Sequence, residues 1–128
     1  MPEKRKVLAV DDDPFIRKFL RAKLEQEGYE SGCFRDGYAA MAGMKKASES
    51  GEPYGLVVCH VNCRGRNELI GYIRETHPTV PIIAITAGTI GGDINSAESN
   101  MWAKLVLTKP QGVINELGNA LNKYYPKE

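Results

Sequence analysis

Short apolar runs alternate with amphipathic stretches five times along this chain of 128 residues. Such alternation is typical of repeated β-α units that build a parallel sheet. The apolar runs are rich in Val, Ile and Leu, as strands that are buried on both faces usually are. We therefore predict five strands, over residues 6–10, 29–34, 56–60, 81–85 and 104–107.

The amphipathic stretches predict the helices. The first helix begins at Pro14 behind an Asp cap, carries Leu20 and Leu24 on its apolar face, and ends at Gly28. Further helices are expected over residues 37–48, 67–76 and 111–124. Residues 88–103 contain few helix formers, so a fourth crossover helix is expected to start late and to be short or mobile. Right-handed crossovers between parallel strands favour a doubly wound sheet in the order 2-1-3-4-5, with helices on both faces.

Composition limits the classes of function. Seventeen basic residues against sixteen acidic ones give a net charge of +1, which argues against nucleic acid as the main partner. The chain is expected to form one domain over residues 1–128. The N-terminal residues lack the apolar segment of a signal peptide, and no apolar run approaches the length of a membrane span, so we predict a cytoplasmic protein.

Three cysteines at irregular spacing are predicted to be reduced thiols rather than a disulfide framework. The spacing of Cys59, His60 and Cys63 matches neither the usual zinc pairs nor a haem attachment run. Strand alternation sends Cys59 and His60 to opposite faces of the sheet, so Cys59 is expected in the core.

Polar residues follow four of the predicted strands. Asp11 and Asp12 come after the first, His60 ends the third, and Thr86 and Lys109 follow the fourth and fifth. The carboxyl ends of parallel strands form one edge of the sheet, where ligands of such folds bind. Adjacent carboxylates need a compensating cation, which indicates a divalent-metal site. An equally open interpretation is that an Asp merely caps the first helix.

Several short motifs follow one another in order. They are Val7-Leu-Ala-Val-Asp-Asp-Asp-Pro, Gly28-Tyr-Glu, Asp36-Gly37, Leu56-Val-Val, Ile83-Ala-Ile-Thr86-Ala87 and Leu107-Thr-Lys109-Pro110. Together they resemble the receiver domain of two-component response regulators over nearly the whole chain. The resemblance implies a flavodoxin-like fold. It also implies that Asp11 and Asp12 bind Mg²⁺, that Thr86 reads a phosphoryl group, and that Lys109 pairs with it.

The sequence departs from that family at the phosphorylation site. The family's third strand ends in an aspartate that takes phosphate from a histidine kinase, whereas this strand ends in His60. Asn62-Cys63-Arg64-Gly65 replaces the usual Met-Pro-Gly, Val106 replaces an aromatic switch residue, and Trp102 replaces a small residue. These changes predict a receiver that kept its fold and lost its phosphorylation cycle.

Four interpretations of His60 follow from its chemistry. It is expected to form a hydrogen bond with Asp12, or to lie against Asp11 and Asp12 with a raised pKa that neutralises the cluster without Mg²⁺. With Asp11 and Asp12 it also has the ligand types of a transition-metal site. Finally, His60 itself is a candidate phosphate acceptor. No cofactor is expected otherwise.

The predicted function is that of a protein-interaction module in two-component signalling, without enzymatic activity. The expected partner is a histidine kinase or another two-component protein, with no nucleic acid or membrane involved, and the protein is expected to be a monomer or a weak homodimer. With no output domain attached, the signal is expected to leave through helix four, strand five and helix five, where Trp102, Val106 and Tyr124 offer apolar contacts. The alternative is a metal or phosphohistidine switch built on His60.

Overall fold

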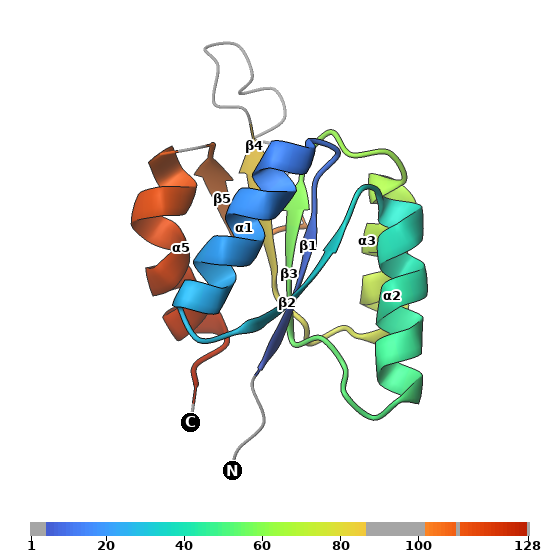
Figure 1. Ribbon diagram of the computed structural model, residues 1–128. Helices are drawn as coiled ribbons and strands as arrows, with labels where there is room; N and C mark the ends of the chain where they lie inside the picture. Colours follow the sequence, from blue (N-terminus) through green and yellow to red (C-terminus); the bar gives the residue numbers. More distant parts are fainter. Residues whose placement is uncertain (1–4, 87–101, 110, 128) are drawn as a thin grey trace.

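The computed structural model describes residues 5–86, 102–109 and 111–127. Its strands and helices alternate along the chain (Figure 1). In chain order they are β1 (Lys6–Val10), α1 (Pro14–Gln26), β2 (Glu30–Phe34), α2 (Gly37–Glu49), β3 (Leu56–His60), α3 (Arg66–Thr76), β4 (Ile82–Thr86), β5 (Leu105–Thr108) and α5 (Gln111–Tyr124). The predicted fourth crossover helix falls mainly on residues 87–101, outside the described residues.

The strands form one parallel sheet in the order β2-β1-β3-β4-β5, which confirms the predicted topology. Observed and predicted strand limits differ by one residue at most. Tyr29, for example, was predicted to open the second strand. Its N–H instead donates to the carbonyl of Leu24 across Gly28, which has a left-handed φ of 89°, so Tyr29 closes the first helix.

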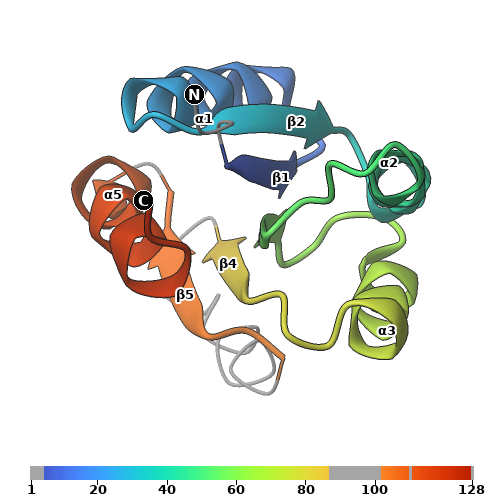
Figure 2. The same ribbon diagram turned by 90° about the horizontal axis from the view of Figure 1, so that it is seen from below.

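Helices cover both faces of the sheet, α1 and α5 on one side and α2 and α3 on the other (Figure 2). Each face has its own apolar core. The α1/α5 core includes Leu20 and Leu117, and the α2/α3 core includes Met44 and Leu69. Strand residues alternate between the two cores, as the period of two requires.

The N-termini of α1, α2 and α3 are formed in different ways. The Asp13 side chain caps α1 by accepting from the N–H of Phe15, and Asp36 caps α2 from the N–H of Ala39. The start of α3 has no side-chain cap and follows Gly65, whose φ of 76° is left-handed. The loop between β3 and α3 therefore turns on a glycine. Within the described residues, no helix is long and apolar enough to cross a membrane.

Candidate functional site

The carboxyl edge of the sheet, at the top of Figure 1, gathers the predicted polar residues. Asp11 is fully buried directly after β1, and His60 and Thr86 are buried at the ends of β3 and β4. The Lys109 N–H donates to the Thr86 carbonyl at 2.7 Å, which fixes the start of the lysine side chain at the end of β5. Asp12, by contrast, is exposed.

The Asp11 carboxylate has hydrogen-bond partners on both oxygens. Its Oδ1 accepts from the Asp13 backbone N–H, and its Oδ2 accepts from Lys109 Nζ, each at 2.9 Å. The Asp11 carbonyl also accepts from Arg17 Nη1 at 2.8 Å. A buried carboxylate requires such a paired cation and hydrogen bonds. Lys109 thus already neutralises Asp11 within the protein.

The His60 ring lies beside this ion pair, with Nδ1 3.8 Å from Asp11 Oδ2. Among the described residues, the buried Nδ1 atom has no hydrogen-bond partner. The predicted hydrogen bond between His60 and Asp12 is therefore not formed by Nδ1.

Burial lowers the pKa of His60 from its ordinary value, and the positive charge of Lys109 lowers it further. The carboxylates of Asp11 and Asp12 act in the opposite direction but offset this only in part. The prediction of a raised His60 pKa was wrong for two reasons. Burial removes the ring from water, which disfavours its charged form, and Lys109 already neutralises Asp11. A lowered pKa favours the neutral form of the His60 imidazole near pH 7.

The geometry does not fit the predicted metal site. Both oxygens of Asp11 are engaged within the protein, one of them by a lysine whose charge opposes a cation. Across the ranges that the structure describes, no group of three or more His, Cys, Asp and Glu side chains is arranged to hold a metal ion. The residues in place suit neither six oxygen ligands around Mg²⁺ nor a tetrahedral transition-metal site.

The predicted interaction residues are half-buried and lie in different surroundings. Trp102 packs against the α2/α3 core, whereas Tyr124 packs against the α1/α5 core. Val106 belongs to β5, the edge strand of the sheet. The Arg66 guanidinium lies 5.5 Å from the centre of the Trp102 ring, and within the described ranges the buried Trp102 Nε1 has no hydrogen-bond partner.

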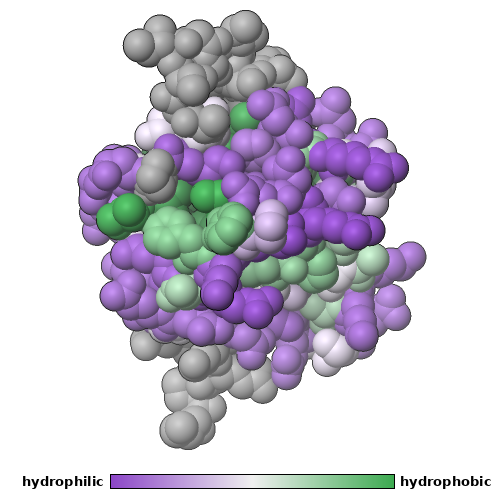
Figure 3. All heavy atoms as spheres, turned by 45° about the horizontal axis from the view of Figure 1, so that its top comes forward, coloured by the Kyte–Doolittle hydropathy of each residue, from purple (hydrophilic) through white to green (hydrophobic). Residues whose placement is uncertain are grey.

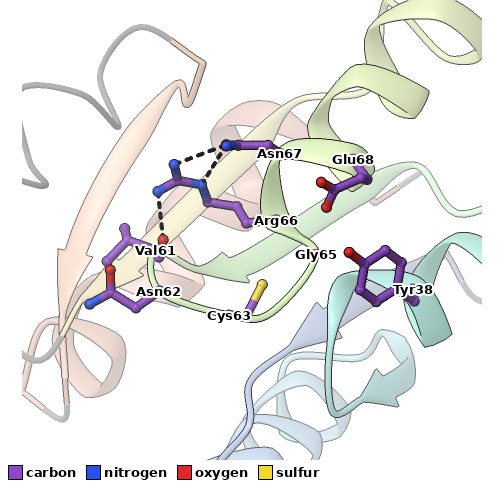
Figure 4. A pocket seen from close by; sticks show the side chains of 8 residues that line it. All are labelled: Tyr38, Val61, Asn62, Cys63, Gly65, Arg66, Asn67 and Glu68. Carbon is purple, nitrogen blue, oxygen red and sulfur yellow. Dashed lines mark hydrogen bonds between the residues drawn. The ribbon is translucent and has the colours of Figure 1, made fainter.

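A polar hollow of about 340 Å³ opens between the β3–α3 loop and the start of α2 (Figure 4). No pattern in the sequence predicts this hollow. Its lining includes Tyr38, Asn62, Cys63, Gly65, Arg66 and Glu68. The Arg66 Nη1 donates to the carbonyl of Val61, which holds the loop against α3. The one signal in the sequence was Gly65, which marks a tight turn.

The outer surface near the carboxyl edge is largely hydrophilic, with a smaller hydrophobic area (Figure 3). Among the described residues, the large apolar side chains that are most exposed are Phe15, Tyr38 and Ile114. Phe15 lies at the start of α1, close in sequence to the acidic residues.

Comparisons with known proteins agree with this fold. The family model described as "Response regulator receiver domain" matches residues 7–122. A curated relative, the transcriptional regulatory protein AruR of Pseudomonas aeruginosa, is 38% identical over 64 residues, which cover 50% of this chain and 26% of that protein. The match thus spans about a quarter of the relative's length.

Solved structures share the fold over most of the chain. The chemotaxis response regulator CheY4 of Vibrio cholerae has a TM-score of 0.75 and 27% identity, covering 93% of this chain and 100% of that chain. The response regulator TrrA of Thermotoga maritima, solved in complex with Mg²⁺–BeF, has a TM-score of 0.74 and 30% identity, with 94% and 98% covered.

Proposed function

We propose, from the premise that this chain belongs to the response regulator receiver domain family of two-component signalling, that it works without phosphorylation on aspartate and signals by binding another protein. One observation carries the proposal. The strand β3 ends in His60, so the position at which the family's aspartate accepts phosphate holds an imidazole.

The charge arrangement supports this proposal. A phosphorylated receiver needs a free acceptor carboxylate and a cation that can follow the phosphoryl group. Here Lys109 is held by the buried Asp11 carboxylate, and His60 beside them has a lowered pKa, which favours its neutral form. At the edge of the sheet the lysine is therefore already paired, and the ring beside it favours the uncharged state.

The proposed partner is a histidine kinase or another two-component protein, and no enzymatic activity is expected. We propose Trp102, Val106 and Tyr124 as part of the contact surface. In support of this, Val106 lies half-buried on the edge strand β5. Trp102 and Tyr124 are also half-buried, so each retains surface for a partner to cover.

The test is exposure of the protein to acetyl phosphate and, separately, to beryllofluoride, each with Mg²⁺. We expect no added phosphate by intact mass and no beryllofluoride-dependent change in the amide NMR signal of Thr86. The matched control is His60→Asp, which restores a carboxylate at the end of β3. A phosphorylated aspartate in the wild-type chain would refute the proposal.

The alternative function is a switch in which His60 accepts phosphate itself. The observation in its favour is the buried Nδ1 atom, which has no partner in the described part of the chain. Acid-labile phosphate on His60 after acetyl phosphate treatment tests this alternative. A phosphohistidine would replace the proposal above.

A further inference from the structure

Two thiols lie against each other at the base of the β3–α3 loop. Cys59 Sγ and Cys63 Sγ are 3.6 Å apart, both buried, and both are free thiols in the structure. Cys59 is fixed in β3 on the α2/α3 side of the sheet. The chain then turns back on itself, since the Cys63 N–H donates to the His60 carbonyl at 3.3 Å.

We propose that Cys59 and Cys63 form a redox-active dithiol that closes to a reversible intrachain disulfide on reaction with a small peroxide. The inference is independent of the proposed function, because it rests on the two sulfur atoms and not on phosphorylation. A disulfide bond is about 2.05 Å long, so the sulfur atoms must approach by about 1.5 Å. Cys63 belongs to a loop rather than to a strand, and loops accommodate such shifts most readily.

The two cysteines have different surroundings, which assigns their roles. Cys63 lines the polar hollow in Figure 4 and keeps a small exposed surface of 5%, whereas Cys59 has none. The hydrogen bond with the Cys59 side chain and the positive charge of Arg66 lower the pKa of the Cys63 thiol, and burial offsets this only in part. The same contact and burial raise the pKa of Cys59 well above its ordinary value. Cys63 is thus the attacking thiolate and Cys59 the resolving thiol.

The reaction balances in two steps. The Cys63 thiolate attacks one peroxide oxygen, the O–O bond breaks, and a sulfenic acid and hydroxide form. The Cys59 sulfur then attacks the sulfur of the sulfenic acid, loses its proton and displaces water. In total, two thiols and one hydrogen peroxide give one disulfide and two waters, with the thiols oxidised and the peroxide reduced.

The disulfide would close a ring of the chain that contains His60, Val61 and Asn62. Its formation would therefore affect the candidate site, to which His60 belongs. The same loop contacts α2, because the Gly37 N–H donates to the Arg64 carbonyl at 2.7 Å. A change in the loop therefore reaches both the end of β3 and the start of α2. Oxidation would give the protein an input that needs no phosphate acceptor.

The experiment treats the full chain with hydrogen peroxide, alkylates the remaining thiols and maps the peptides by mass spectrometry. We expect the number of alkylated cysteines to fall from three to one, with Cys33 still alkylated and Cys59 joined to Cys63. Dithiothreitol should restore all three. Cys33→Ser is the matched control and should form the same disulfide.

Two variants test the assigned roles. In Cys59→Ala, peroxide followed by dimedone should label Cys63 as a sulfenic acid, and no intrachain disulfide should form. In Cys63→Ala, Cys59 should remain an unlabelled thiol. The inference is overturned if wild-type Cys59 and Cys63 both stay alkylatable after peroxide treatment, or if the disulfides formed join Cys33 or a second chain instead.

Discussion

Removing the positive charge of Lys109 should convert His60 from a neutral ring into the cation that balances Asp11. In the native protein Lys109 Nζ lies 2.9 Å from Asp11 Oδ2, and His60 Nδ1 lies 3.8 Å from the same oxygen. The substitution Lys109→Met keeps much of the apolar side chain and deletes the ammonium group. The buried Asp11 carboxylate then has His60 as its nearest remaining cationic group among the contacts described.

The size of the effect follows from the distance. Two unit charges 3.8 Å apart attract by about 4 kcal/mol at an effective dielectric constant near 20. The same attraction acts in the wild type, where the positive charge of Lys109 opposes it, so the substitution removes the opposing charge. Burial of the ring still lowers the pKa, but an attraction of this size is then unopposed by Lys109, so we expect the His60 pKa in Lys109→Met to rise above its unfolded value of about 6.5.

NMR titration of the imidazole C–H signals measures this directly, because the chain has only two histidines. His60→Gln assigns the signals, and Lys45→Met, at an exposed position on α2, is the matched control for loss of a lysine. The control should leave the lowered pKa of His60 unchanged.

The same change reverses the pH dependence of the free energy of unfolding. In the wild type the folded His60 pKa lies below the unfolded value, so stability is full above about pH 6.5 and falls as the pH drops below it. In Lys109→Met the folded pKa is the higher one, so the His60 contribution is present below about pH 6.5 and is lost as the pH rises through the folded value. A His60 pKa in Lys109→Met that stays below 6.5 would refute this account of the site.

Three further predictions, two of them with a control variant, test the scaffold. Leu117→Ala empties a fully buried position in the α1/α5 core and should lower the free energy of unfolding, measured by urea titration, by about 2–5 kcal/mol. The control is Ile114→Ala on the same helix, where the native side chain is 44% exposed, and it should change the free energy of unfolding by less than about 0.5 kcal/mol. Gly37→Ala places a methyl group against the backbone carbonyl of Gly65, so unfolding should begin at lower urea and the loop amides should shift in NMR spectra. Asp13→Ala removes the N-cap of α1 and should cost about 1 kcal/mol, and Asp13→Asn should restore most of it. Native stability in Leu117→Ala or Gly37→Ala would contradict the packing described.

The fold was predictable from the sequence because the three inner strands β1, β3 and β4 are short, apolar and almost wholly buried, whereas the edge strands β2 and β5 are less so. The predicted and observed strand limits differ where local hydrogen bonds set the end of an element, and the pattern of apolar residues does not show these bonds. Tyr29 is apolar enough for a strand, but its N–H completes the end of α1. The position of Asp11, His60, Thr86 and Lys109 on one edge was also predictable, because it follows from parallel strand order alone.

The charge state of His60 was not predictable in the same way. Whether the His60 pKa rises or falls depends on the competing effects of burial, one lysine and two carboxylates. The lysine, Lys109, is 49 positions away in the sequence. Likewise, the spacing of Cys59 and Cys63 matches no known metal motif. Only the turn after His60 brings the two sulfur atoms together, and that turn depends on backbone hydrogen bonds.

The contact between Arg66 and Trp102 gives the protein an optical reporter of its own. Trp102 is the single tryptophan of the chain, so its fluorescence can be excited apart from that of the six tyrosines. Its ring lies under the first residue of α3, three positions after Cys63. A movement of the β3–α3 loop changes the charge next to the indole, and emission wavelength responds to such a charge. Stopped-flow fluorescence of the unlabelled protein can therefore follow events at the end of β3 in real time, whatever triggers them.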